Sequence, residues 1–183
     1  MALELAPEDV TAVPVLFPFE LRMEFEIGET LTITLRMKNC SEKEQTVTAA
    51  LHTYFNVKAA ETIAISGLDG VVYENRVVGA EASGCVQRGD IRIDQEIDRI
   101  YLDTAGAVEI RDPGFGRTIV VEKSGSNSTV VWNPWVRKSQ AMPDFGDDEY
   151  HTMVCVETVN AATDRRTLTP GGSHALTQKV SVK

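Results

Sequence analysis

Apolar and charged residues alternate in two neighbouring segments near the start of the chain. In residues 21–27 every odd position is apolar and every even position is charged, and in residues 31–38 apolar odd positions alternate with threonine and basic residues. A period of two is typical of a β-strand with one buried face. Gly28 and Glu29 follow the first segment, so we predict a β-hairpin whose two strands bury the same face.

Shorter segments along the rest of the chain also predict strands. Gly, Pro, Asn and Asp residues separate them, as is typical between antiparallel strands. The predicted strands are residues 46–55, 62–66, 71–78, 91–93, 97–102, 107–111, 118–123, 129–132, 152–159 and 175–182. Asn133 and Pro134 suit the start of one short helix, and Pro143 suits its end. The pattern predicts an all-β chain, an antiparallel sandwich or barrel.

The length of 183 residues favours a single domain, residues 1–183, that can bury a core of its own. The 18 basic and 27 acidic residues give a net charge of −9, which argues against nucleic acid or an anionic membrane surface as the main partner. No segment approaches the roughly 18 apolar residues of a membrane span. The acidic N-terminal segment does not resemble a signal peptide, so we expect a cytoplasmic protein.

The three cysteines, Cys40, Cys85 and Cys155, are far apart in the sequence. Their spacing includes no CxxC pair and no Cys/His ligand pattern, so we expect no metal site and no zinc. Reduced thiols are the natural interpretation for cysteines of a cytosolic protein.

Two polar residues interrupt predicted strands. His52 lies on the face of residues 46–55 that is neither charged nor strongly apolar, and imidazole can act as a general acid or base near neutral pH. The alternative is a histidine that is hydrogen-bonded inside a sheet. Glu157 lies in the otherwise apolar segment 153–159. A buried carboxylate must be paired or have a raised pKa, and a raised pKa suits a general base, whereas a residue at a strand edge would simply point to water.

Other polar and aromatic residues leave similar choices open. Asp98 could bind a ligand hydroxyl or form a surface ion pair. The acidic run at 144–149 lacks the alternating oxygen ligands of a calcium loop, so we expect a solvated loop. Trp132 and Trp135 could stack on a sugar or pack in the core.

Several ordered blocks of the sequence resemble one protein family. They are ALHTYF at 50–55, SGLDG at 66–70, DRIY at 98–101, VWNPW at 131–135, DFGDDEY at 144–150, VCVE at 154–157 and LTPGG at 168–172. Together they resemble the hexose-6-phosphate mutarotases, the glucose-6-phosphate 1-epimerase branch of the aldose 1-epimerases, from about residue 3 to the C-terminus.

The resemblance implies a fold and a chemistry. The fold is a β-sandwich of the galactose-mutarotase type. The activity is interconversion of the α and β anomers of a hexose or hexose 6-phosphate, with no metal and no cofactor. By this resemblance Glu157 takes the proton of the C1 hydroxyl, His52 protonates the ring oxygen, and Asp98 binds sugar hydroxyls.

The resemblance covers only the C-terminal part of a family chain. In the family a preceding portion adds strands and the arginines that bind phosphate, whereas Arg22 and Arg36 lie on charged strand faces and are expected to be solvated. A sandwich truncated at its N-terminus leaves a sheet edge open to pairing. We therefore expect a homodimer that covers this edge. The alternative functions are a non-catalytic carbohydrate-binding protein and a structural protein that has kept only the fold.

Overall fold

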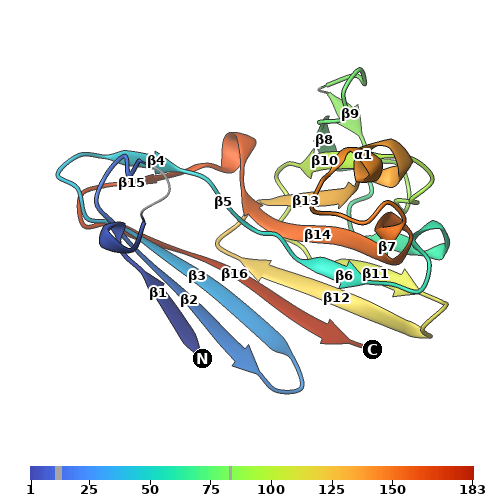
Figure 1. Cartoon of the computed structure of the whole chain (residues 1–183), viewed down its shortest axis with the longest axis horizontal. Helices are drawn as coiled ribbons and strands as arrows, with labels where there is room; N and C mark the ends of the chain where they lie inside the picture. Colours follow the sequence, from blue (N-terminus) through green and yellow to red (C-terminus); the bar gives the residue numbers. More distant parts are fainter. Residues whose placement is uncertain (11–13, 83) are drawn as a thin grey trace.

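The computed structural model describes residues 1–10, 14–82 and 84–183. Within these residues the chain forms two seven-stranded antiparallel sheets and one two-stranded sheet (Figure 1). The first sheet has the order β1 (Ala2–Leu5), β2 (Phe19–Ile27), β3 (Leu31–Asn39), β16 (Ser173–Val182), β12 (Arg117–Ser124), β11 (Val108–Asp112) and β7 (Ala64–Ser66). The second has β5 (Ala49–Leu51), β14 (Met153–Asn160), β13 (Ser128–Asn133), β10 (Ile97–Tyr101), β8 (Val72–Asn75) and β9 (Cys85–Val86), and β6 (Tyr54–Asn56) also pairs with β14.

The remaining elements are short. β4 (Gln45–Val47) pairs with β15 (Arg166–Leu168), and α1 (Trp135–Ala141) follows β13. Single 3-10 turns occur at Pro7–Asp9, Ala60–Thr62, Glu149–Thr152 and Ala162–Asp164. None of the helices in the described residues is long and apolar enough to cross a membrane. The prediction of an all-β antiparallel sandwich with one short helix is confirmed.

The predicted hairpin is confirmed as β2 and β3, whose register pairs Ile27 with Leu31 and Leu21 with Met37. The predicted helix is also confirmed. The side chain of Asn133 accepts a hydrogen bond from the backbone N–H of Trp135 at 2.9 Å, and the helix ends at Ala141, before Pro143.

Three predicted strands differ in the structure. The segment 46–55 divides into β4, β5 and β6, because the chain changes sheets within it. β4 belongs to the two-stranded sheet, whereas β5 and β6 belong to the second sheet. Residues 91–93 form only an isolated bridge from Ile91 to Ile65 instead of a strand. The predicted segment 62–66 begins in a 3-10 turn, so that only Ala64–Ser66 is a strand.

The core fills the space between the two sheets. From the first sheet it contains Ile110, Ile119 and Val121, and from the second it contains Val154 and Val156. A smaller apolar cluster of Trp132, Met153 and Cys155 lies on the other face of the second sheet. The alternation along β14 therefore sends Val154 and Val156 inward and Met153, Cys155 and Glu157 outward.

Lys123 connects the two sheets. It lies on β12, and its Nζ donates to the backbone oxygen of Ser128 at 2.7 Å and to Oγ1 of Thr129 at 2.6 Å, both on β13. Burial lowers the pKa of Lys123 to about 8. The charged lysine is thus less favourable in the folded protein than in the unfolded chain, where the pKa of lysine is about 10.4.

This pKa difference predicts a pH-dependent stability. Between pH about 8 and 10.4 the folded state binds fewer protons at Lys123 than the unfolded state, so the free energy of unfolding rises with pH. Relative to a Lys123→Met variant, the wild type is expected to gain about 2–3 kcal/mol across this range. Urea unfolding of both proteins at a series of pH values measures the difference. Stability curves that stay parallel would contradict the prediction.

Candidate active site

Strand register places four side chains in a row across the outer face of the second sheet. Tyr54 is paired with Cys155, Cys155 with Trp132, and Trp132 with Asp98. Paired residues of antiparallel strands project to the same face of a sheet. Since side chains alternate along a strand, Glu157 shares this face with Cys155.

His52 lies directly beside Glu157. It lies in the chain between β5 and β6. Both of these strands pair with β14, so His52 lies next to β14 on this face. The distance from Nε2 of His52 to Oε1 of Glu157 is 3.4 Å. The side chain of Glu157 is 5% exposed and that of His52 is 48% exposed, so the carboxylate forms the floor of the site and the imidazole faces solvent.

Burial changes the proton affinity of both groups. The pKa of Glu157 is raised to about 8, first by burial and then by the negative charge of Asp98. Burial lowers the pKa of His52 below its usual value. Both shifts favour the uncharged forms, so near neutral pH the pair holds a single proton between them.

Aromatic rings surround the pair. The ring of Tyr54 stacks on that of His52 with centroids 4.9 Å apart, and Trp132 meets both rings edge-on at 5.9 Å. Phe145 contacts Trp132 from the loop after α1 at 6.3 Å. Trp132 is thus part of the site, whereas Trp135 packs against the core between the sheets.

Asp98 is held by a lysine that sequence reasoning missed. The Nζ of Lys138 on α1 lies 3.2 Å from Oδ2 of Asp98 and 3.6 Å from Oε1 of Glu96. It also lies 5.8 Å from the ring centroid of Trp132. Asp98 and Lys138 lie at the rim of the site. There the carboxylate can accept, and the ammonium can donate, hydrogen bonds with sugar hydroxyls. The structure thus brings all three predicted site residues, His52, Asp98 and Glu157, to one face.

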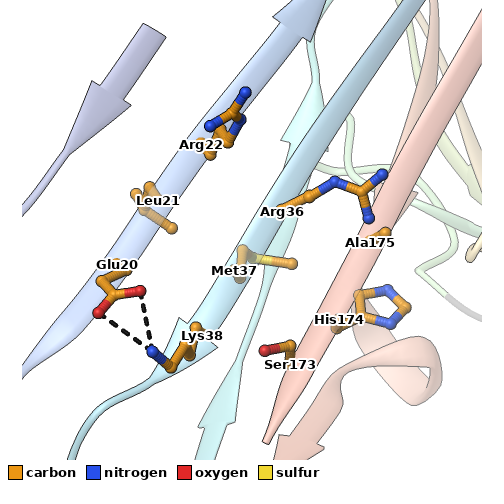
Figure 2. A pocket seen from close by; sticks show the side chains of 9 residues that line it. All are labelled: Glu20, Leu21, Arg22, Arg36, Met37, Lys38, Ser173, His174 and Ala175. Atoms are coloured by element: carbon orange, nitrogen blue, oxygen red, sulfur yellow. Dashed lines mark hydrogen bonds and ion pairs between the residues drawn. The ribbon is translucent and has the colours of Figure 1, made fainter. Parts of the chain in front are cut away.

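Two other polar regions are the acidic run, which borders this face through the contact of Phe145 with Trp132, and a hollow on the first sheet. The acidic residues of the run at 144–149 are exposed, as expected of a solvated loop. The hollow, of about 440 Å³, lies over β2, β3 and β16, and Figure 2 shows the side chains that line it. There Arg22 and Arg36 are about half exposed, and both bond to the carboxylate of Glu24. Their prediction as solvated residues of a charged strand face is confirmed.

Comparison with known proteins identifies similar chains. The family model described as Aldose 1-epimerase matches residues 3–181. A protein of Cenchrus ciliaris named "Putative glucose-6-phosphate 1-epimerase" is 36% identical over 175 residues, which are 93% of this chain and 52% of the relative. One of the same name from Escherichia coli is 34% identical and covers 90% of this chain and 53% of the relative. The chain therefore spans about half the length of these relatives.

Solved structures agree with the fold. A "putative mutarotase" of Salmonella typhimurium superposes with a TM-score of 0.82 at 32% sequence identity, over 99% of this chain and 58% of that chain. A protein of Synechocystis superposes with a TM-score of 0.76 at 18% identity, over 100% of this chain and 61% of that one, which shows likeness of fold alone. The expected galactose-mutarotase type of sandwich is confirmed.

Proposed function

The chain belongs to the aldose 1-epimerase family, and from this premise we propose that it interconverts the α and β anomers of a hexose or hexose 6-phosphate. The observation that supports the proposal most strongly is the contact between a buried carboxylate and an exposed imidazole, Glu157 and His52, at 3.4 Å. In this proposal Glu157 is the base, His52 is the acid, and Asp98 binds sugar hydroxyls.

The spacing of the pair suits the two oxygens that must exchange protons. Opening a pyranose removes the proton of the C1 hydroxyl and adds a proton to the ring oxygen. Both oxygens are bonded to C1, so the base and the acid must lie side by side. The 3.4 Å between the carboxylate and imidazole atoms lets each one reach its own oxygen at hydrogen-bonding distance.

The single proton that His52 and Glu157 hold between them is also enough for a complete catalytic cycle. The pKa shifts favour the uncharged pair, in which the proton lies on Glu157, and the proton can pass to His52 across their 3.4 Å contact. Once it is on His52, Glu157 accepts the C1 hydroxyl proton while His52 donates to the ring oxygen. The open-chain aldehyde then rotates about the C1–C2 bond, and reclosure on the other face of C1 reverses both transfers. The pair returns to its starting state with no net gain or loss of protons.

The surroundings of the pair supply positioning. The aromatic rings of Tyr54 and Trp132 offer flat apolar surfaces for the C–H face of a sugar. Asp98 and Lys138 offer an acceptor and a donor for hydroxyl groups at the rim. Holding a substrate in a reactive geometry lowers a barrier by several kcal/mol.

The experiment that tests the proposal follows anomer interconversion of freshly dissolved α-glucose 6-phosphate. A dehydrogenase specific for the β anomer reports its formation, and glucose and galactose are run in parallel. We expect at least one sugar to interconvert faster than the spontaneous rate. A rate equal to the spontaneous one for every sugar would contradict the proposal, and sugar binding without acceleration would leave the carbohydrate-binding alternative.

We also propose that the protein is cytoplasmic and forms a homodimer. Its three cysteines are free thiols, which suits a reducing compartment. The predicted dimer covers an open sheet edge, and β1 is an edge strand of the first sheet. The dimer proposal is supported by the apolar face of β1, β2 and β3 at this edge, which reach beyond the strands of the second sheet (Figure 1). On this face Leu3 is 57% exposed and Leu5 is 40% exposed. Leu5 also lines a groove of about 630 Å³, together with Phe17, Leu21 and other apolar residues.

A second copy of the chain suits this face better than a charged partner. The charged residues of these strands, among them Glu4 and Arg22, form ion pairs with one another on the opposite face of the sheet. Among the described residues that line the groove, Lys38 is the one charged side chain, and it pairs with Glu20. Two copies with a net charge of −9 each can therefore meet there with little repulsion between facing groups. Contact through one shared patch gives a twofold dimer.

Sedimentation velocity tests the dimer. The wild type is expected to sediment as a dimer at micromolar concentration, and Leu3→Glu is expected to sediment as a monomer because it buries a charge in the interface. Val72→Glu serves as the control, since Val72 lies on the second sheet and is 44% exposed. A wild type that stays monomeric at tens of micromolar would contradict the dimer.

A further inference from the structure

The proposed mechanism leaves one possible metal ligand of the site unused. Cys155 is fully buried beneath the site, between the strand positions of Tyr54 and Trp132. Its Sγ, a ring nitrogen of His52 and a carboxylate oxygen of Glu157 all lie within 4.8 Å of one another. The three atoms are a nitrogen, a sulfur and an oxygen ligand that converge on one point.

We propose that His52, Cys155 and Glu157 form a binding site for Zn²⁺, and that the bound ion inhibits the enzyme by occupying its acid/base pair. Zinc in proteins is bound by histidine nitrogen, cysteine sulfur and carboxylate oxygen. Three protein ligands leave the fourth tetrahedral position for water or a sugar hydroxyl. The inhibitory part of this inference rests on the proposed function, whereas the binding part does not.

The distances fit such a site. Zinc–ligand bonds of about 2.0–2.3 Å place the ligand atoms of a tetrahedral set roughly 3.3–3.7 Å apart. The 3.4 Å between Nε2 of His52 and Oε1 of Glu157 already has this length. The sulfur lies within 4.8 Å of both, so an approach of at most about 1 Å remains. Rotation of the His52 and Glu157 side chains about their own bonds can provide it.

The sheet holds two of the ligands rigidly. Cys155 and Glu157 are alternate residues of β14, so the pleat fixes them on one face. The carboxylate of Asp98 adds negative charge near His52 and Glu157, which favours a cation. When the ion binds, the thiol of Cys155 and the His52–Glu157 pair each release one proton to solvent, so that the sulfur bonds as thiolate and Glu157 as carboxylate.

Occupation by zinc removes the groups that the reaction needs. The lone pairs of His52 and Glu157 bond to the ion and are no longer available to the two sugar oxygens. The spacing of cysteines in the sequence could not reveal this set, because His52 and Cys155 come together only when the strand at Tyr54–Asn56 pairs with β14.

Cobalt replaces zinc as a spectroscopic probe of the site. Adding Co²⁺ to the whole chain is expected to produce the near-ultraviolet charge-transfer band of a cobalt–thiolate bond, and excess Zn²⁺ is expected to abolish it. The band should be lost in Cys155→Ser and in His52→Ala, whose side chain is 48% exposed in the wild type. It should persist in Cys40→Ser and Cys85→Ser. No thiolate band in the wild type, or a band that survives Cys155→Ser, would overturn the inference.

The activity assay separates this inference from the proposed function. The rate of each protein is measured with and without Zn²⁺. Zinc is expected to lower the acceleration by the wild type at least tenfold. For Cys155→Ser, zinc should change the acceleration less than twofold from the value that this variant shows without zinc. Acceleration without any cobalt–thiolate band would support the function and overturn the metal site. A thiolate band that needs Cys155 and His52, without acceleration of any sugar, would support metal binding and contradict the function.

Discussion

Replacing Glu157 by Gln is expected to lower the acceleration of anomer interconversion by about 10²–10⁴-fold, the usual contribution of a general base. Glutamine has nearly the same shape but cannot accept the proton of the C1 hydroxyl. Because the side chain is 5% exposed, the amide fills the same space and the fold should be kept. The coupled assay with the β-specific dehydrogenase measures the loss.

His52→Ala is expected to show a loss of similar size, since the acid and the base act in the same step. Two variants serve as matched controls: Glu122→Gln changes an exposed carboxylate of β12 that pairs with Lys179, and His151→Ala changes an imidazole that pairs with Glu61. Both controls should keep the wild-type rate. Full activity in Glu157→Gln would remove the carboxylate from the mechanism.

Gly125→Ala is expected to destabilise the fold by about 3 kcal/mol or more, a large share of the stability of a typical domain. Gly125 connects β12 of the first sheet to β13 of the second, with a φ of +72°. An added Cβ would overlap the backbone oxygen of Ala175, in addition to the strain of a left-handed backbone. The carbonyl of Gly125 also accepts hydrogen bonds from Asn160 at 2.9 Å and from Arg166 at 3.2 Å.

Two further glycines separate the contributions of strain and overlap. Gly116 has a φ of +63° with no atom near an added Cβ, so Gly116→Ala is expected to cost only about 1 kcal/mol. Gly28 has open space and an ordinary φ, so Gly28→Ala should be nearly neutral. Urea unfolding measures all three. An effect of Gly125→Ala no larger than that of Gly116→Ala would contradict the predicted overlap.

The sequence predicted the hairpin of β2 and β3 well because alternation depends only on which residues avoid water. It could not show what covers the apolar side. Leu3, Leu5 and Ile27 are all at least 40% exposed, although alternation places them on the apolar face. Burial of that face depends on packing partners, which a strand pattern does not contain.

The segment 46–55 shows another limit. Its alternation is correct throughout, with Leu51 and Phe55 buried and His52 and Tyr54 exposed. The pattern continues without interruption where the chain leaves β15 and joins β14. A change of pairing partner leaves the alternation intact, so one strand was predicted where the structure has three.

The site was partly predictable for a similar reason. Glu157 stood out as a charge within an apolar strand. Cys155 and Tyr54 did not stand out, since neither is charged and both suit a strand. Lys138 lies 40 residues from Asp98 on a short helix, where a lysine is usually solvated, so only the fold reveals their pairing.

The most direct test of the acid/base mechanism is exchange NMR at anomeric equilibrium, run on glucose 6-phosphate, glucose and galactose. Magnetisation transfer between the α and β C1 protons measures the interconversion rate with no coupling enzyme. With catalytic amounts of wild type, we predict for at least one sugar exchange cross-peaks that are absent without protein and absent with Glu157→Gln. Exchange that is unchanged by the protein for every sugar, or that persists in Glu157→Gln at the wild-type rate, would contradict the account.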